Sequence, residues 1–296
     1  MIEKLIYTNE FGQSIELSTV SPFHVNIPKD VSGLSGVKNQ IFSSSTAGQD
    51  GDTFVGQRIL ARDIDIVGYI NECDKNEVQR LRQLLVRILN PNYNAALTYQ
   101  MGDYKRVISC RVNSSPSFSP SPLLTKLTIQ LDCLNPFWRD VTETRQEVAK
   151  WDGLFEFPEP EGLAIDEGEG MEFDTRDPNL IVNVQNHGDV DAGMTVVFRA
   201  FGAIINPSLT NAETQEFIRL FVAMNGGDMI KISTGYGQKR AIIRQNGEET
   251  DAFRYLDEDS TFFPLRVGDN YLRHDCDGNL DNLDVSVTHS DLYLGV

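Results

Sequence analysis

Carboxylates are the side chains whose spacing in this sequence comes nearest to a known chemistry, and one set of them lies at residues 275–284. Aspartates alternate there with Asn and Gly, the oxygen-rich composition of a calcium-binding loop. Such loops place a glycine at the sixth position and a bidentate Glu at the twelfth, whereas Gly278 is fourth here and no Glu stands twelfth. We therefore favour a polar hairpin turn and predict no metal ligand.

A second acidic cluster, Asp257, Glu258 and Asp259, has the residue types of a glycosidase pair. Such carboxyls must face one another across a substrate at roughly 5–9 Å. Consecutive residues in a strand point to opposite faces, so a turn cap fits this triplet better. Ser35 and Lys38 match the bare S-x-x-K of penicillin-binding enzymes, but neither S-D-N nor K-T-G accompanies them.

The histidines and the aromatic residues do not form a recognisable site in the sequence. The histidines are scattered over unrelated segments, which predicts ordinary surface or turn positions for His24, His187, His274 and His289. The aromatic residues that a sugar-binding surface would use are Trp138, Trp151, Tyr236, Phe253, Tyr255, Phe262 and Phe263. Phe262 and Phe263 are adjacent, so at most one faces solvent in a strand, and we expect most of the set in the core. Because H-E-x-x-H, G-x-S-x-G and G-x-x-x-x-G-K-S/T are also missing, we predict no catalytic residue, no cofactor and no enzymatic activity.

Composition narrows the classes of protein further. The formal net charge of −17 argues against a nucleic-acid binder, because phosphate neutralisation needs clustered Lys and Arg. No apolar run approaches the roughly 18 residues of a membrane span, and the first residues begin a strand-like segment rather than a signal peptide. We therefore expect assembly in the cytoplasm, without nucleic acid or membrane. Cys110 and Cys133 alternate with apolar residues and should be buried and reduced, while Cys73 and Cys276 lie at loop edges.

The first half of the chain has the pattern of a β domain with one helix. Ile64 and Ile66 alternate with acidic residues, as in a half-buried strand. A helix is predicted from about residue 75 to 89, with Asp74 as its N-cap and Glu77 completing a capping box.

Two more strands are predicted at 105–112 and 124–133. The Ser- and Pro-rich segment between them is too polar and too rich in proline to enter a sheet, so we expect it to form a loop. In a simple hairpin this arrangement places Cys110 near Lys126 and out of reach of Cys133.

Residues 141–178 form an acidic connector rich in Pro and Gly, which favours a solvated linker. An arm that docks on a basic neighbouring subunit is the alternative. Residues 179–296 have the pattern of an antiparallel β-sandwich: Ile230 and Ile232 alternate with polar residues, and Asn246-Gly247 is a hairpin turn pair. The sequence thus divides into an N-terminal domain at 1–140, the connector, and a C-terminal domain.

The order of these turns and strands resembles the distal tail proteins of long-tailed bacteriophages. The matching landmarks in the C-terminal half are Asn206-Pro207-Ser208-Leu209, Gly227-Asp228, Asn246-Gly247, the tract 254–265 and Gly268-Asp269-Asn270. Those in the N-terminal half are the strand region 54–69, a helix that stops at Asn90-Pro91, and the closing Asn135-Pro136-Phe137-Trp138. The resemblance implies a mainly β fold with two domains. The first is a β-sandwich with one α-helix and a protruding hairpin, for whose tip the Ser/Pro segment is one candidate; the second is a galectin-like antiparallel β-sandwich.

The resemblance implies a structural function. Six copies would close into a ring through their N-terminal domains, as one ring or as two rings back to back, at the tip of the virion tail. This hub would contact the major tail tube protein, a tail-associated hub or lysin protein, and a receptor-binding protein or tail fibre. Two alternatives remain: a carbohydrate-binding module that recognises the host surface, which the galectin-like domain implied by the resemblance suggests, or a hydrolase of the host wall. The first alternative predicts exposed aromatics beside amide and acid groups in a groove.

Overall fold

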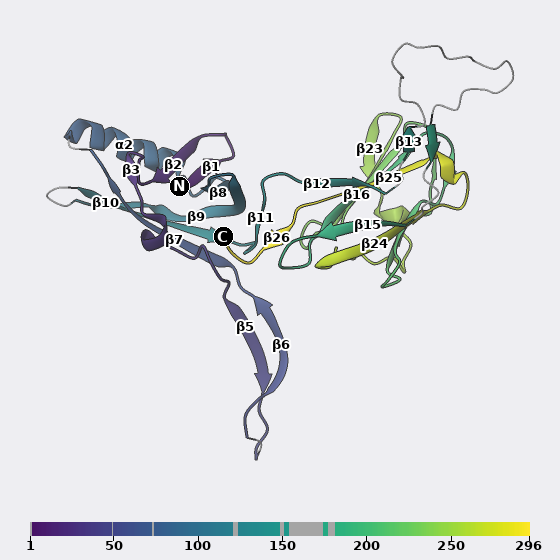
Figure 1. Cartoon of the computed structure of the whole chain (residues 1–296), viewed down its shortest axis with the longest axis horizontal. Helices are drawn as coiled ribbons and strands as arrows, with labels where there is room; N and C mark the ends of the chain where they lie inside the picture. Colours follow the sequence, from purple (N-terminus) through teal and green to yellow (C-terminus); the bar gives the residue numbers. More distant parts are fainter. Residues whose placement is uncertain are drawn as a thin grey trace, which may run out of the picture. The chain divides into compact units, whose positions relative to one another are not determined.

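The computed structural model describes residues 2–48, 50–72, 74–120, 124–148, 151–153, 174–176 and 181–296. The chain forms two compact units, the first made of residues 1–141 with 292–296 and the second of residues 142–291. Both are built mainly of strands, as predicted (Figure 1). Most of the acidic connector at 141–178, the predicted linker or docking arm, lies outside the described residues, as does Cys73. Within the connector, strands β13 (Trp151–Gly153) and β14 (Asp174–Arg176) pair with each other.

Unit 1 is organised around one large sheet in the order β10-β7-β3-β2-β1-β8-β9-β11-β26. Strand β10 pairs with both β7 and β9, so the sheet closes on itself around the core. Alternate residues of each strand point inward, as Leu5 and Tyr7 do from β1. The strands are β1 (Glu3–Asn9), β2 (Ser14–Ser18), β3 (Phe23–His24), β4 (Val31–Ser32), β7 (Arg62–Ile70), β8 (Ala95–Met101), β9 (Tyr104–Pro120), β10 (Thr125–Cys133), β11 (Trp138–Asp140) and β26 (Leu292–Tyr293).

The predicted helix is α2 (Lys75–Ile88), which follows a one-turn helix, α1 (Ile27–Asp30). Asp74 is its N-cap, since its side chain accepts a hydrogen bond from the Asn76 N–H. The predicted capping box is wrong. Glu77 forms an ion pair with Arg80 instead, and the Asp74 N–H donates to the side chain of Glu72. The buried face carries Leu81, Leu85 and Ile88, the apolar spacing that predicted the helix.

The prediction that the Ser/Pro segment forms a loop is also wrong, because this segment continues strand β9 to Pro120. Ser117 pairs with Thr128 and Ser119 with Lys126, and the pairing continues as far as Pro120 and Thr125. A register shift opposite the Thr128–Gln130 stretch leaves a bulge on β9 around Pro116, where a missing N–H costs no ladder hydrogen bond. The longer strand also overturns the expected neighbour of Cys110. Arg111 pairs with Asp132, so Cys110 lies beside the Cys133 end of β10 rather than near Lys126.

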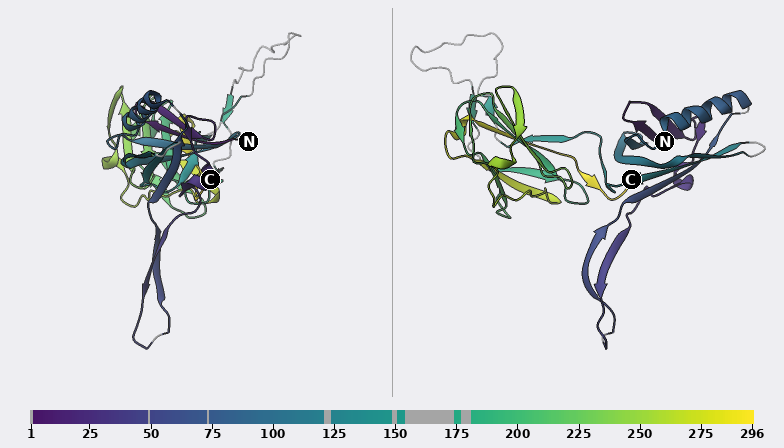
Figure 2. Two further views of the ribbon diagram at one scale, coloured as in Figure 1. Left: turned by 90° about the vertical axis from the view of Figure 1, so that its left-hand side faces the viewer. Right: turned by 180° about the vertical axis from the view of Figure 1, so that it is seen from behind.

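A second hairpin, not the Ser/Pro segment, projects from unit 1. It consists of β5 (Asn39–Ser44) and β6 (Thr53–Ile59), which pair with each other and with no strand of the large sheet. Figures 1 and 2 show it standing away from that sheet in every view. We call this hairpin the arm.

The C-terminus of the chain belongs to unit 1. Strand β26 pairs with β11, Trp138 lying opposite Tyr293. The sequence predicts residues 292–296 as part of the C-terminal domain, whereas the structure places them with the N-terminal unit. The reason is local: Arg62 and Arg106 hold this end of the chain through its backbone and through the Tyr293 ring.

Unit 2 contains two main antiparallel sheets, in the orders β12-β25-β16-β21-β22-β23 and β15-β24-β18-β19. A shared cluster of apolar side chains fills the core, including Val196, Phe198, Leu272 and Phe263. Asn246 and Gly247 have positive φ angles and close the β22–β23 hairpin, as predicted. The strands are β12 (Thr144–Glu147), β15 (Ile181–Asn186), β16 (Met194–Ala200), β17 (Ile204–Ile205), β18 (Ser208–Asn211), β19 (Phe217–Arg219), β20 (Ala223–Met224), β21 (Met229–Ser233), β22 (Arg240–Gln245), β23 (Glu248–Asp251), β24 (Gly268–Asp275) and β25 (Leu283–His289).

Candidate functional site

The acidic segment at 275–284 forms a network of side-chain contacts rather than a coordination sphere. The Asp277 carboxylate accepts hydrogen bonds from Asn206 Nδ2 and Arg219 Nη2, each at 2.7 Å. These partners, Asn206 first, hold the pKa of Asp277 below its usual value. Across the described residues, no group of three or more His, Cys, Asp or Glu side chains could hold a metal ion.

The other candidate catalytic residues are engaged locally. Asp257 Oδ1 accepts from the Asp259 N–H at 3.0 Å, the turn cap that the sequence predicted. Lys38 Nζ lies 2.7 Å from Asp63 Oδ2, so the S-x-x-K lysine is part of a surface ion pair. Among the helices of the described residues, none is long and apolar enough to cross a membrane.

The prediction that all four histidines lie at the surface is wrong for His274 and His289. His274 and His289 are buried, because each occupies an inward-facing position of a strand in unit 2. His289 Nε2 lies 3.1 Å from the Gln185 carbonyl oxygen and 3.3 Å from Asp291 Oδ1. His24 and His187 are at least partly exposed.

The proposed aromatic sugar platform is not assembled. Trp138 and Phe263 are fully buried, as expected for core residues, while Tyr236 stands fully exposed on a turn. Phe253 and Phe262 pack on each other with ring centroids 5.8 Å apart. Trp151 has no described side chain.

The arm carries the most exposed apolar cluster of unit 1, which the sequence reasoning missed. Its large side chains have exposed fractions of 63% at Ile41, 43% at Phe42, 62% at Phe54 and 66% at Val55. A signal was available in the sequence, since two apolar pairs flank a Ser-, Gly- and Asp-rich stretch, as in a hairpin. Exposed apolar groups of this kind mark contact sites.

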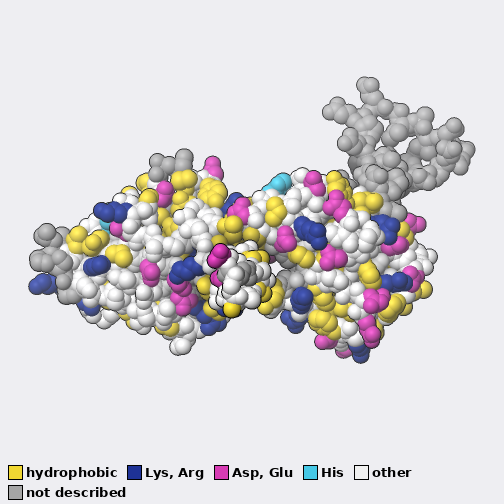
Figure 3. Space-filling model, turned by 90° about the horizontal axis from the view of Figure 1, so that it is seen from below, with side chains coloured by type: hydrophobic (Ala, Val, Ile, Leu, Met, Phe, Trp, Pro, Cys, Tyr) yellow, Lys and Arg dark blue, Asp and Glu magenta, His cyan; other side chains and the backbone are white. Residues whose placement is uncertain are grey.

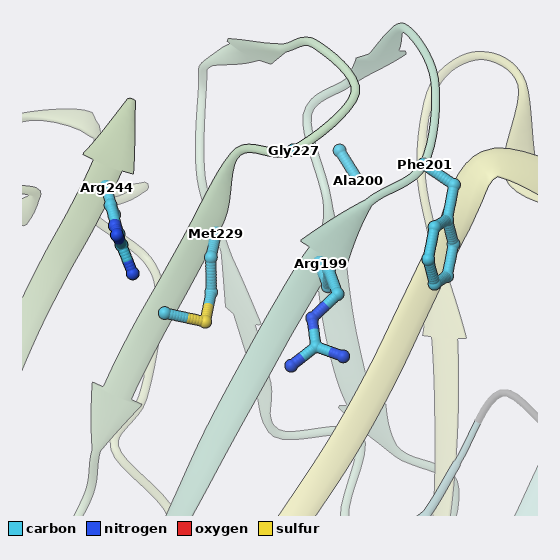
Figure 4. Close-up of a pocket in the computed structure, with 6 residues that line it drawn as sticks. All are labelled: Arg199, Ala200, Phe201, Gly227, Met229 and Arg244. Carbon is cyan, nitrogen blue, oxygen red and sulfur yellow. The ribbon is translucent and has the colours of Figure 1, made fainter. Parts of the chain in front are cut away.

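A first depression lies on the outer face of unit 2 and has a volume of about 290 Å³. Arg199, Met229 and Arg244 occupy paired positions on β16, β21 and β22, and Figure 4 shows their side chains together on one face of the sheet. Phe201 stands at one end. Within the described part of the chain, neither arginine forms a side-chain hydrogen bond or an ion pair. The depression offers cations and apolar surface, with no nucleophile or general base.

A second depression of about 320 Å³ lies between β12 and β15. It is lined by the polar side chains of Thr144, Gln146, Asn183, Gln185 and His187. On the face of the molecule shown in Figure 3, acidic, basic and apolar side chains are interspersed rather than gathered into one charged region.

Two protein-family models match the chain, and together they span most of both units. The model described as phage tail protein RIFT-related domain matches residues 12–133. The model described as siphovirus-type tail component, C-terminal domain, matches residues 187–292. No curated protein sequence matches the chain.

Solved structures share the fold over almost the whole chain. The crystal structure of phage SPP1 Dit, described as a paradigm of the hub adsorption apparatus in phages that infect Gram-positive bacteria, matches with a TM-score of 0.70. Its identity is 14%, and the match covers 98% of this chain and 99% of that one. The phage P2 baseplate in its activated conformation matches with TM-scores of 0.55 with Ca and 0.53 with Sr. In both cases the identity is 11% and the coverage 98% of each chain.

Proposed function

Because this chain belongs to the distal tail proteins of siphovirus-type phages, structural proteins of the tail-tip hub, we propose that six copies of it close into a ring. The ring would join the major tail tube protein to the adsorption apparatus, with a tail-associated hub or lysin protein and a receptor-binding protein or tail fibre as neighbours. Assembly would take place in the bacterial host cytoplasm, before the ring enters the virion tail tip.

The arm is the observation that carries this proposal. A two-stranded hairpin is marginally stable in water unless it packs against something. Here both strands present large apolar side chains to solvent, and no other strand of the described chain pairs with them. A neighbouring subunit would supply the missing contact.

An arm that lies on the next copy gives a heterologous interface, in which one patch meets a different patch. Repetition of such a contact closes a ring when the rotation between neighbours fits a whole number of copies. The net charge of −17 opposes association through charge alone, so apolar contact must supply the attraction. We therefore assign the ring interface to unit 1, with unit 2 free to contact other tail proteins.

Native mass spectrometry and negative-stain imaging of the full chain test the ring. The expected particle has a mass of about 199 kDa, six times the 33.2 kDa of one chain, or twice that for two stacked rings. Phe42→Asp and Val55→Asp should leave folded monomers, because each places a charge in the arm contact. Tyr236→Asp alters a fully exposed aromatic of unit 2 and should leave the ring intact. A wild-type protein that stays monomeric at tens of micromolar, or arm variants that still form rings, would refute the proposal.

A further inference from the structure

We infer that unit 2 carries a binding site for a neutral saccharide in the depression between β12 and β15 and on the adjoining face of β24. The depression is lined by Thr144, Gln146, Asn183, Gln185 and His187. Asp269 and Tyr271 of β24 lie beside it as the strand partners of Gln185 and Asn183, and we call these seven residues the amide groove. The inference goes beyond the ring function and does not depend on it, because every residue of the groove belongs to unit 2.

The amide groove includes a carboxylate held in one orientation by two of the lining residues. Asp269 Oδ1 accepts hydrogen bonds from Asn183 Nδ2 at 2.7 Å and from Gln185 Nε2 at 2.8 Å. Both bonds go to the same oxygen, and within the described chain no side chain donates to Oδ2. Those two amides, Asn183 first, also hold the pKa of Asp269 below its usual value, so it is an acceptor at neutral pH. Oδ2 is thus oriented and available for a ligand hydroxyl.

Further hydrogen bonds fix the residues whose side-chain amides contact Asp269. Asn183 Oδ1 accepts from the Asn270 N–H at 3.1 Å, and Gln146 Nε2 donates to the Asn183 carbonyl at 2.7 Å. Beneath them, buried His289 lies against the Gln185 carbonyl. The side-chain carbonyls of Gln146 and Gln185 keep their acceptor capacity for a ligand. A site fixed in advance loses little conformational entropy on binding.

Tyr271 supplies the apolar surface that a sugar ring needs. It is paired with Asn183 across β15 and β24, and paired residues present their side chains on the same face of a sheet. Its side chain is 38% exposed, so part of the ring meets solvent beside the amides. An aromatic face beside fixed donors and acceptors suits a pyranose, which has apolar C–H faces and a rim of hydroxyls.

The groove selects for a neutral ligand of small size. Its lining includes no Lys or Arg, and the Asp269 carboxylate would repel a phosphate or a carboxylate. By contrast, the depression at Arg199 and Arg244 has the charge for an anion. A volume of about 320 Å³ is at the lower end of ligand sites, which run from about 300 to 1,000 Å³. One or two sugar units are therefore the expected occupants.

Binding, not hydrolysis, is the activity that this groove can support. Glycoside hydrolysis needs two carboxyl groups that flank the scissile bond. Among the lining residues and their strand partners on β24, Asp269 is the acid. A bound saccharide would therefore leave unchanged.

Saturation-transfer NMR and calorimetry of the full-length protein test the inference with lactose, maltose, cellobiose and chitobiose, each up to 10 mM. At least one should bind saturably. Asp269→Asn keeps the shape of the side chain and removes its charge, and Tyr271→Ala removes the aromatic face; each should weaken binding about tenfold or more. Arg244→Ala is the matched control on another face of unit 2 and should leave binding unchanged.

Thermal melts of each variant verify that unit 2 remains folded. No saturable binding of any of the four sugars overturns the inference. So does binding that Asp269→Asn and Tyr271→Ala leave unchanged, or binding that Arg244→Ala abolishes, which would move the site to the first depression. These outcomes are independent of the ring test, since none of these residues lies on the arm.

Discussion

The guanidinium of Arg62 donates a hydrogen bond of 2.5 Å to the backbone carbonyl of Leu294, joining two residues 232 positions apart in the sequence. The same side chain donates to the carbonyls of Pro136, Gly33 and Leu34. It is 4% exposed, and burial lowers its pKa from the usual value. In the described chain its partners are peptide carbonyls, not a carboxylate, so Arg62 binds the C-terminal segment to unit 1 as a buried connector.

Removal of residues 292–296 is therefore expected to destabilise unit 1. The deletion removes strand β26 and leaves Nη2 of the buried Arg62 guanidinium without its acceptor. Breaking a hydrogen bond to a charged group and exposing the apolar surface beneath should cost about 2–4 kcal/mol. Calorimetry should show the unit 1 transition at lower temperature and the unit 2 transition unchanged. Lys38→Met, which breaks an exposed ion pair, serves as control and should not move either transition.

Gly33, whose carbonyl accepts a hydrogen bond from Arg62, occupies a position that only glycine fits. Its φ is +84°, and a Cβ at this position would overlap the carbonyl oxygen of Asp63. Gly36 has a similar φ of +77°, yet a Cβ there would meet nothing within 4 Å. Gly33→Ala should thus combine positive-φ strain with a backbone clash and cost about 3 kcal/mol, whereas Gly36→Ala should cost about 1 kcal/mol. Urea unfolding compares the two; equal midpoints would show that the loop relaxes freely.

The buried thiol of Cys133 predicts a loss of stability at alkaline pH. Burial raises its pKa from 9.0 to about 12. Because the folded thiol keeps its proton to a higher pH than the unfolded one, the free energy of unfolding is unaffected below pH 9 and falls as pH rises toward 12. At pH 10.5 the loss from this group should be about 2 kcal/mol. Urea midpoints at pH 8 and 10.5 measure it, and Cys133→Ala should show a smaller decrease between the two pH values than the wild type.

At neutral pH, the same burial should keep Cys110 and Cys133 unreactive. Both side chains are almost inaccessible, and burial raises the pKa of Cys110 as well. Iodoacetamide at pH 8 is expected to modify neither residue before denaturation, while Cys276, which is partly exposed, should react before both of them. Rapid modification of Cys133 in the native protein would contradict the structure.

Regular alternation made the core predictable, and the exceptions have physical causes. The apolar stripe of α2 and the two-residue period of β21 were read from sequence, because burial on one face leaves that signature. Strand β9 was predicted too short, since serines and prolines disfavour strands on average. At residues 113–120 the serines face solvent, and a bulge accommodates Pro116.

The sites depend on contacts that a sequence does not display. Asn183 and Tyr271 are 88 positions apart, and only the pairing of β15 with β24 makes them neighbours. The aromatic set chosen from sequence omitted Tyr271 for that reason. Strand β26 is too short for periodicity, so nothing in Leu292 or Tyr293 indicated that they leave unit 2.

The acidic connector should be the preferred site of proteolysis, yet cleavage there should not separate the two halves. The sequence between residues 151 and 177 is rich in Gly and Pro, which favours nicking. A cut leaves β12 on the N-terminal fragment, although β12 pairs with β25 in unit 2. It leaves β26 on the C-terminal fragment, although β26 pairs with β11 in unit 1. Each fragment thus contributes a strand to the other unit, and the nicked protein should elute as one species.

Separation should require denaturant, and gel filtration after limited trypsin or Glu-specific digestion provides the measurement. The control is the same digestion of a chain that ends at Asp291, which lacks β26 and retains only the β12–β25 connection. Its fragments should separate at a lower urea concentration than those of the full chain. Two fragments that part in buffer without denaturant would show that neither strand exchange holds the units together, and the assignment of residues 292–296 to unit 1 would then be wrong.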